Sequence, residues 1–299
     1  MPNYENLSPE MTHRIEMDRR TGCLPAVGFA DGDILRRRQV QSDQPTLWRP
    51  AFVHDIDKII HCPSADGKVT PAMIQAVLSS HSSEHMVSPK LVYISNTTEV
   101  GTVYSRSELV ALRDFCKANN LYIYCDGARI GSAITAVGSD AGFADYAECC
   151  DAFTIGGTKN GLLFGEALVI TNKELQPFFR HCMKQQGAIL AKGRLLGVQF
   201  DAIFENDLFL ELARHANRLA VRINEGLQAL GIPQLAQSPS NQIFPILTNE
   251  AVEKLRENFT FEIQQPMDDS HTCIRFVTGW NSTDEDVGTL LATLKELTA

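Results

Sequence analysis

The sequence of 299 residues contains no run of about 18 apolar residues, so it predicts no membrane-spanning helix. Its first twenty residues have no positively charged start followed by an apolar stretch, so we expect no secretory signal. Positive charge is in deficit, because 27 Lys and Arg face 36 Asp and Glu and leave a net charge of −9. This balance argues against nucleic acid or an anionic membrane surface as the main partner.

Paired cysteine spacing is also lacking. The eight cysteines are scattered apart from Cys149-Cys150, and no CxxC pair occurs. Without such spacing we expect neither a zinc site nor a redox site, and no metal is predicted. With no secretory signal the thiols are expected to stay reduced, so the cytoplasm is the predicted compartment.

Residues 1–58 lack the hydrophobic periodicity of the rest of the chain. They contain the triplet Arg36-Arg37-Arg38 and scattered prolines, and we interpret them as an atypical, irregular segment. A basic interaction patch is the alternative. It is disfavoured, because nine Asp and Glu offset eight Lys and Arg across these residues.

From Ile59 onward, strand and helix patterns alternate. This rhythm predicts a parallel sheet covered by helices, followed by a smaller α+β domain, with domain limits at 59–205 and 206–299. Ser105 and Glu108 form a capping box, which predicts a helix start. Strands are expected at 90–96, 121–126, 151–157, 166–170, 242–247 and 273–280, and helices from residue 71, from residue 105, over 207–230 and from residue 283.

Two residues at the ends of predicted strands carry the functional signal. Asp126 follows "LYIYC", and Lys159 lies 33 positions later in "FTIGGTKNGLLFG". A nucleotide-binding loop would need Ser or Thr after the lysine and a helix beyond it. Asn160 follows instead, and the chain continues into a strand, so this interpretation is excluded. Asp126 alone could simply cap the next helix.

Together the two residues suit pyridoxal 5′-phosphate. This cofactor needs a lysine for covalent attachment and an acidic partner that keeps its pyridine nitrogen protonated. The glycines around Lys159 would let its backbone lie close to the cofactor. The pair at this spacing therefore favours a covalent lysine over a phosphate loop.

Two stretches carry a resemblance to a known family. "YISNTTEVGTVYSRSELVALRDFCKANNLYIYCDGARIGSAI" and "CDAFTIGGTKNGLLFGEALVI" resemble the low-specificity threonine aldolases of the aromatic amino acid β-eliminating lyase group, and the similarity runs from about Ile59 to the carboxyl end. The resemblance implies an α/β fold, that of the PLP-dependent transferases (aspartate aminotransferase-like, fold type I). It also implies a large domain that is incomplete at the N-terminus and a small C-terminal α+β domain.

The resemblance assigns roles to five residues. Lys159 would form the Schiff base with pyridoxal phosphate, and Asp126 would pair with its pyridine nitrogen. Arg129 would lie near the cofactor and the substrate carboxylate, and Arg275 would be the second carboxylate anchor. Asn96 would line the cofactor pocket, with turn formation as its alternative role.

The implied reaction is cleavage of a β-hydroxy-α-amino acid such as threonine to glycine and an aldehyde. The general base is not identified, because His81, His85 and His215 are candidates by residue type only. The family assembles as dimers or tetramers, so the resemblance implies a homo-oligomer with a small amino acid as its substrate.

The family's N-terminal portion carries a Gly-Gly-Thr-type loop for the cofactor phosphate and a histidine that stacks on the ring. Residues 1–58 contain no such loop, and their only histidines are His13 and His54, in unlike surroundings. We therefore expect this portion to be missing or replaced. Three interpretations stay open: an active lyase, a truncated and catalytically impaired homologue acting as a subunit partner, or a β-eliminating lyase for another amino acid.

Overall fold

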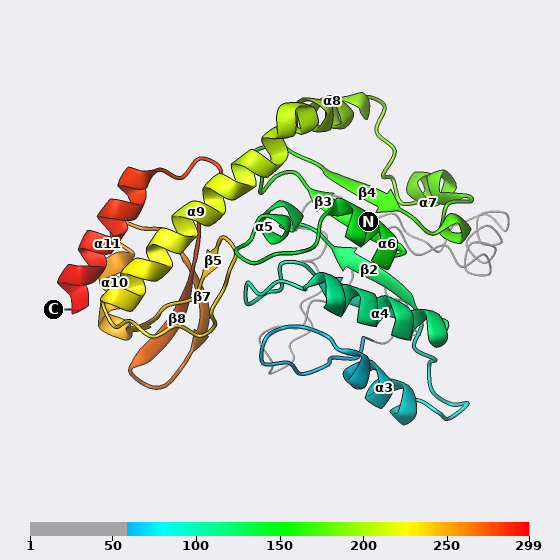
Figure 1. The fold of residues 1–299 in the computed structure, drawn as a ribbon, viewed down its shortest axis with the longest axis horizontal. Helices are drawn as coiled ribbons and strands as arrows, with labels where there is room; N and C mark the ends of the chain where they lie inside the picture. Colours follow the sequence, from blue (N-terminus) through cyan, green and yellow to red (C-terminus); the bar gives the residue numbers. More distant parts are fainter. Residues whose placement is uncertain (1–58, 299) are drawn as a thin grey trace, which may run out of the picture.

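The computed structural model describes residues 59–298, and the segment 1–58, interpreted above as atypical, lies outside them (Figure 1). Two sheets are joined by one long helix. The first part of the chain contains α3 (Pro71–Ser80), β1 (Leu91–Ser95), α4 (Arg106–Ala118), β2 (Tyr122–Asp126), α5 (Ile130–Ile134), α6 (Phe143–Cys149), β3 (Ala152–Gly156) and β4 (Glu166–Ile170).

The first sheet has the strand order β1-β2-β3-β4. β1, β2 and β3 are parallel, as predicted, but β4 runs antiparallel to β3. The predicted parallel sheet is thus extended by one antiparallel strand. Residues 157–165 form the whole β3–β4 connection. That segment is too short for the crossover that a parallel neighbour requires, so the chain can only turn back.

The main core lies on one face of this sheet. Alternate strand residues point to opposite faces, and Ile94, Ile123 and Phe153 enter a buried cluster with Leu109 and Leu112 of α4. The opposite face is less covered within the described residues, because Tyr93 of β1 is 50% exposed. The apolar stripe of α4 therefore packs where its helical period predicted.

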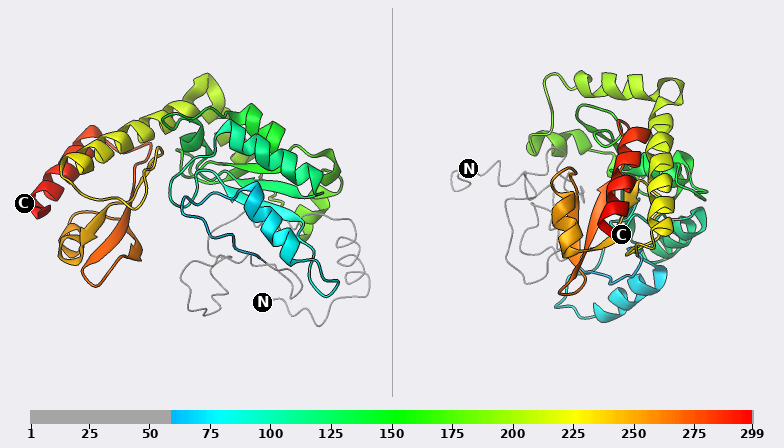
Figure 2. Two further views of the ribbon diagram at one scale, coloured as in Figure 1. Left: turned by 60° about the horizontal axis from the view of Figure 1, so that its bottom comes forward. Right: turned by 90° about the vertical axis from the view of Figure 1, so that its left-hand side faces the viewer.

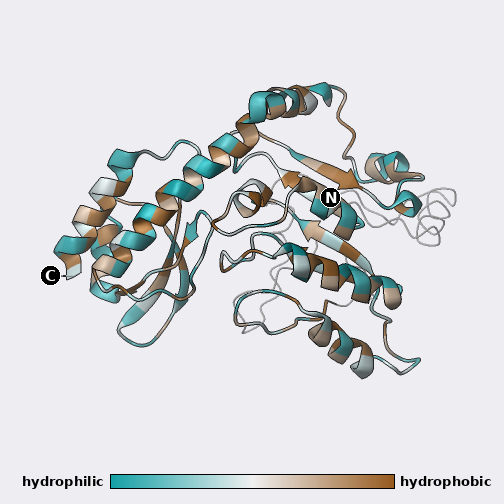
Figure 3. Ribbon diagram, in the orientation of Figure 1, coloured by the Kyte–Doolittle hydropathy of each residue, from teal (hydrophilic) through white to brown (hydrophobic). Residues whose placement is uncertain are grey.

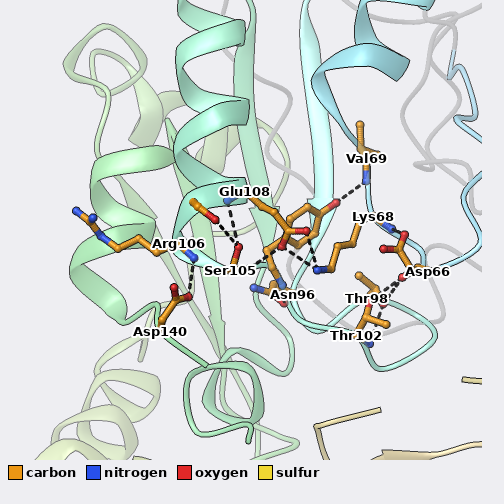
Figure 4. A network of polar contacts seen from close by, with 12 residues as sticks. Asp66, Lys68, Val69, Asn96, Thr98, Thr102, Ser105, Arg106, Glu108 and Asp140 are labelled. Atoms are coloured by element: carbon orange, nitrogen blue, oxygen red, sulfur yellow. Dashed lines mark hydrogen bonds and ion pairs between the residues drawn. The ribbon is translucent and has the colours of Figure 1, made fainter. Parts of the chain in front are cut away.

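A polar network fixes the start of α4 (Figure 4). Ser105 and Glu108 form the predicted capping box, and Lys68 Nζ lies 2.8 Å from Glu108 Oε2. Burial alone would raise the pKa of Glu108, but hydrogen bonds from Lys68 and Ser105 lower it below its usual value. The Asp140 carboxylate accepts a hydrogen bond from the Arg106 N–H at 2.7 Å. The backbone N–H groups of Arg106 and Glu108 in the first turn are thus paired.

The helix α9 (Leu208–Ala229) connects the two sheets, and Figures 1 and 2 show it running from one to the other. Hydrophilic and hydrophobic bands alternate along it (Figure 3). Phe209 belongs to the first core, whereas Leu219 and Leu227 belong to the second. The predicted domain limit near residue 205 stays a prediction. Before α9 come η2 (Lys173–Leu175), α7 (Phe179–Gln185), α8 (Arg194–Phe204) and η3 (Glu205–Asp207).

The second sheet has the order β5-β8-β6, and β7 also pairs with β8. The strand predicted over 242–247 is broken after Ile243, because Pro245 has no N–H to give to a ladder. The sequence also missed β7. The elements are β5 (Gln242–Ile243), β6 (Ile246–Thr248), α10 (Asn249–Leu255), β7 (Glu262–Pro266), β8 (His271–Val277) and α11 (Asp284–Thr298), and side chains of α9, α10 and α11 fill the core beside this sheet.

Candidate active site

Lys159 lies in the turn between β3 and β4, where glycines let the chain fold tightly on itself. Gly161 and Gly165 have φ values of +106° and +105°, which side chains other than glycine rarely adopt. A Cβ on Gly157 would come within 2.8 Å of the Gly165 carbonyl oxygen. Asn160 is buried, and its Nδ2 donates to the Phe209 carbonyl at 2.7 Å. Backbone conformation and close packing require glycine at these positions, and the predicted approach of the turn to a cofactor stays a prediction.

Asp126 ends β2, and its carboxylate is held from two sides. Oδ1 accepts a hydrogen bond from the Ala128 N–H at 2.9 Å, and Oδ2 accepts one from the Tyr93 hydroxyl at 2.5 Å. The sequence analysis placed Tyr93 in a strand and gave it no role. The only sequence signal was its position one strand away from an end-of-strand aspartate. Both bonds fix the direction of the carboxylate.

The loop after Asp126 lies directly against the end of β3. A Cβ on Gly127 would meet the Thr154 carbonyl oxygen at 1.9 Å, and one on Gly156 would meet the Ala128 carbonyl oxygen at 2.3 Å. The Gly156 N–H donates to the Gly127 carbonyl at 3.0 Å. Only glycine fits at these two positions. The end of β3, which leads to Lys159, therefore lies against the loop that follows Asp126.

The surroundings of Lys159 shift the pKa of its amine downward. Its side chain reaches solvent, but burial of the amine and the nearby Arg129 guanidinium lower the pKa of Lys159. The carboxylates of Asp126, Glu99 and Glu166 oppose this shift. A lower pKa leaves more of the lysine as the neutral, nucleophilic amine at neutral pH. Asp126 and Arg129 are therefore close enough to influence the amine electrostatically.

Glu166 is a further carboxyl group near Lys159 that the sequence did not single out. Burial, and then the neighbouring Asp126 charge, raise the pKa of Glu166 to about 7. It begins β4 and pairs with Gly156 across the sheet. The only signal in the sequence was a charged residue at the start of a predicted strand.

Arg129 and Arg275 converge from different sheets. Burial and then the Arg275 charge lower the pKa of Arg129. The Nε atoms of both side chains are buried and have no hydrogen-bond partner among the described residues. Arg275 forms ion pairs with Glu262 and, at 3.9 Å, with Glu99. Two adjacent guanidinium groups suit a carboxylate ligand, as the resemblance implied.

Asn96 is fully buried at the end of β1. Its Nδ2 donates to the Tyr146 hydroxyl at 2.5 Å, and its Oδ1 accepts from the Tyr104 N–H at 3.3 Å. These bonds give Asn96 a structural task. Its predicted contact with a cofactor stays a prediction.

A pocket of about 260 Å³ opens beside Lys159. The Lys159 turn and Arg129 form one wall, which contains predicted site residues. The other wall comes from the second sheet. The sequence analysis did not predict it, although "SNQIFPIL" and "IRFVTGW" belong to the stretch that resembles the family. The lining residues are Arg129, Thr158, Lys159, Asn241, Val277, Thr278, Gly279, Trp280, Asn281 and Ser282.

The candidate bases do not line this pocket. His81 caps the end of α3, and His85 lies near Glu84 on the surface. His215 Nε2 lies 2.8 Å from the Ser282 carbonyl, so it touches only the rim of the pocket wall. The base therefore stays unassigned. No group of His, Cys, Asp and Glu within residues 59–298 is arranged to hold a metal ion.

Comparison with known families decides the relationship. A family model described as beta-eliminating lyase matches residues 46–250, more than half of the chain. The chain belongs to the beta-eliminating lyase family. The match begins upstream of Ile59, where the resemblance in the sequence began. The stated resemblance to the threonine aldolases of this family is thereby confirmed.

Characterised relatives of this beta-eliminating lyase family member include threonine aldolases. The low specificity L-threonine aldolase of Pseudomonas aeruginosa is 32% identical over 208 residues, which are 69% of this chain and 60% of that protein. The low specificity L-threonine aldolase of Saccharomyces cerevisiae is 30% identical over 161 residues, 54% and 40% of the two chains. The chain thus spans about 60% of the Pseudomonas relative's length.

Solved structures confirm the fold. A threonine aldolase of Leishmania major has a TM-score of 0.79 and 44% identity, over 81% of this chain and 71% of that one. A Sphingomonas wittichii serine palmitoyltransferase has a TM-score of 0.53 and 16% identity, over 70% and 55%. The fold is that of the PLP-dependent fold type I enzymes, as predicted. Among the residues that the structure describes, no helix has the length and apolar character to cross a membrane.

Proposed function

We propose that this chain is a pyridoxal-phosphate-dependent lyase that cleaves a β-hydroxy-α-amino acid such as threonine to glycine and an aldehyde. The observation that carries the proposal is the convergence of three groups. A lysine whose pKa is lowered and a guanidinium with an unpartnered buried Nε line one pocket, and an end-of-strand carboxylate held by two donors, Asp126, influences that lysine electrostatically. Kinship with threonine aldolases supports the substrate class.

The donor set fits pyridoxal phosphate at its two reactive ends. When bound, the cofactor supplies an aldehyde that condenses with amines and a ring that accepts the electrons of a bond broken at Cα. Lys159 would supply the amine for covalent attachment. The Asp126 carboxylate, oriented by Tyr93 and Ala128, would hold a proton on a ring nitrogen. We assign no phosphate-binding site among the described residues.

The guanidinium groups would orient the substrate. Arg129 offers its unpartnered Nε, and Arg275 adds a second positive charge whose present partners are Glu262 and Glu99. A substrate carboxylate would take up these donors in bidentate fashion. This placement leaves the amino group of the substrate on the Lys159 side of the pocket.

Production of glycine from threonine tests the activity. The full chain with pyridoxal phosphate and L-threonine is expected to form glycine and acetaldehyde, and Lys159→Ala is expected to form neither. The matched control is Lys117→Ala, which removes an exposed lysine from α4 and is expected to leave glycine formation unchanged. Absence of glycine from the unmodified protein would refute the lyase activity.

A catalytically impaired homologue that serves as a subunit partner is the second candidate. It rests on the lack of a Gly-Gly-Thr-type loop for the cofactor phosphate in residues 1–58. Cofactor binding without glycine formation would support this candidate over the lyase. A β-eliminating activity on another amino acid would instead release a keto acid and ammonia.

Assembly into a homo-oligomer is part of the proposal. The Leu163 patch, defined as Leu163, Phe164, Leu195 and Val198, is apolar and exposed, with Leu163 at 86% and Val198 at 62%. The Leu163 N–H donates to Gln199 Oε1 at 3.0 Å, so the Lys159 turn lies against α8. A second copy covering this patch would remove apolar surface from water.

We also propose a cytoplasmic location, which a reducing compartment would suit. Free thiols support it: Cys62, Cys116, Cys125, Cys149, Cys150 and Cys273.

A further inference from the structure

The pocket beside Lys159 contains a buried acceptor that no protein group satisfies. Asn241 is 4% exposed and lines the pocket, and its Oδ1 is buried without a hydrogen-bond partner among the described residues. Buried polar atoms in native proteins are almost always paired. An unpaired one in the wall of a pocket therefore indicates a donor on the ligand.

The direction of this acceptor is fixed by its neighbour in the sheet region. Asn241 Nδ2 donates to the Thr278 carbonyl at 2.7 Å, and the Thr278 N–H donates back to the Asn241 carbonyl at 3.1 Å. The Thr278 hydroxyl is itself anchored on the Ala216 carbonyl at 2.7 Å. The amide is therefore held before any ligand arrives, which limits the conformational entropy lost on binding.

Among the lining residues, only Arg129 and Asn241 have a buried side-chain polar atom without a hydrogen-bond partner in the described part of the chain. The carboxylate belongs with Arg129, the cation with an unpartnered Nε. The amine belongs with Lys159, because it must replace the lysine on the cofactor. The remaining donor of a β-hydroxy-α-amino acid is its hydroxyl, and the remaining buried acceptor in the lining is Asn241 Oδ1.

We propose that Asn241 is a specificity-determining residue that accepts a hydrogen bond from the side-chain hydroxyl of a β-hydroxy-α-amino acid. The inference rests on the proposed function. A neutral amide does not take up the hydroxyl proton, so Asn241 selects and orients the substrate while another group acts as base. Trp280, 46% exposed in the same wall, offers an apolar surface to the carbons beyond the hydroxyl.

The test compares two unreactive ligands that differ by one hydroxyl group. In phosphopyridoxyl-L-threonine and phosphopyridoxyl-L-2-aminobutyrate, a reduced C–N bond joins cofactor and amino acid, so neither ligand can be cleaved. Dissociation constants for the cofactor-free full chain are measured by calorimetry. The unmodified protein is expected to bind the threonine ligand about 10-fold more tightly, the usual contribution of one hydrogen bond.

In Asn241→Leu this ratio is expected to fall to about 1. Asn241→Ala repeats the measurement with a smaller side chain if the leucine variant does not fold, as judged by circular dichroism. The matched control is Asn224→Leu, which removes another amide with an unpartnered Oδ1, located on α9 and outside the pocket lining. The control is expected to keep the 10-fold ratio.

The outcomes separate the inference from the proposed function. A ratio that Asn241→Leu leaves at its original value, with both ligands bound, overturns the role of Asn241 alone. Equal affinity of the unmodified protein for both ligands also overturns it. If neither ligand binds the unmodified protein, cofactor binding fails, and the inference falls with the proposed function.

Discussion

The two walls of the pocket differ in how they carry their function. The wall from the first sheet carries two cationic groups that follow strand ends, Lys159 and Arg129, and Asp126 ends β2 outside the lining. The wall from the second sheet uses Asn241 and a turn, Val277–Ser282, and the nearby Arg275 is already paired with Glu262 and Glu99. The comparison indicates that the first wall supplies reactivity and the second wall supplies selection.

Among the changes near the first wall, removing the charge of Asp126 should have the largest effect on glycine formation. Asp126→Asn keeps an acceptor for the Ala128 N–H but loses the negative charge, so glycine formation should fall about 100-fold, or ~2.7 kcal/mol. Steady-state kinetics with threonine would measure it. Asp140→Asn is the control, since Asp140 accepts from the Arg106 N–H outside the pocket lining. A loss below threefold for Asp126→Asn would contradict its role.

Substitutions of Arg129 and Arg275 should have the next-largest effect, and they compare the arginine of the first sheet region with that of the second. Arg129→Lys is expected to raise KM for threonine about 10- to 100-fold, because the buried guanidinium loses its bidentate geometry. Arg275→Lys should raise KM less, since Glu262 and Glu99 already neutralise its charge. Initial rates over a range of threonine concentrations measure both. A larger KM effect for Arg275→Lys would reverse the assignment.

The protonation of Glu166 should give a smaller, pH-dependent effect on stability. Its pKa is raised from 4.5 to about 7 in the folded chain. As pH rises from about 4.5 to about 7, the unfolded chain ionises first, so the folded state loses stability over this window. Glu166→Gln should therefore be more stable than the unmodified protein above pH 7 and gain nothing below pH 4.5.

Urea unfolding midpoints across this pH range measure the effect, with the exposed Glu225→Gln on α9 as a matched control. A pH-independent difference between Glu166→Gln and the unmodified protein would show that Glu166 has an ordinary pKa.

A substitution in the Leu163 patch should affect the pocket least and should instead change the assembly of the protein. Leu163→Asp places a charge on the exposed turn and is expected to lower the molecular mass in sedimentation, because a charge at an apolar contact opposes association. Val137→Asp, at a residue 67% exposed outside the patch, is the control. An unchanged mass for Leu163→Asp would place the subunit contact elsewhere.

The first wall could be predicted from sequence because its signals are local. Asp126 directly ends an apolar strand, and Lys159 follows the next strand among glycines, so their meeting follows from strand order alone. The capping box of α4 was equally local and is confirmed. Residue type and position were enough, without any knowledge of packing.

The second wall could not be predicted in this way. Asn241 and Thr278 are 37 residues apart, and only the pairing of β5 with β8 brings them together. The interruption at Pro245 hid the true strand limits, and β7 has no clear alternation. The Tyr93 contact with Asp126 likewise depends on the register between β1 and β2, which could not be read from the pattern of either strand alone.

The most direct test of the central claim is a titration of the full chain with pyridoxal phosphate, followed by visible absorbance. The unmodified protein and Lys117→Ala are expected to develop the band of a lysine-bound cofactor, and Lys159→Ala is expected to lack it. Absence of the band from the unmodified protein, or an equal band in Lys159→Ala, would contradict Lys159 as the attachment residue.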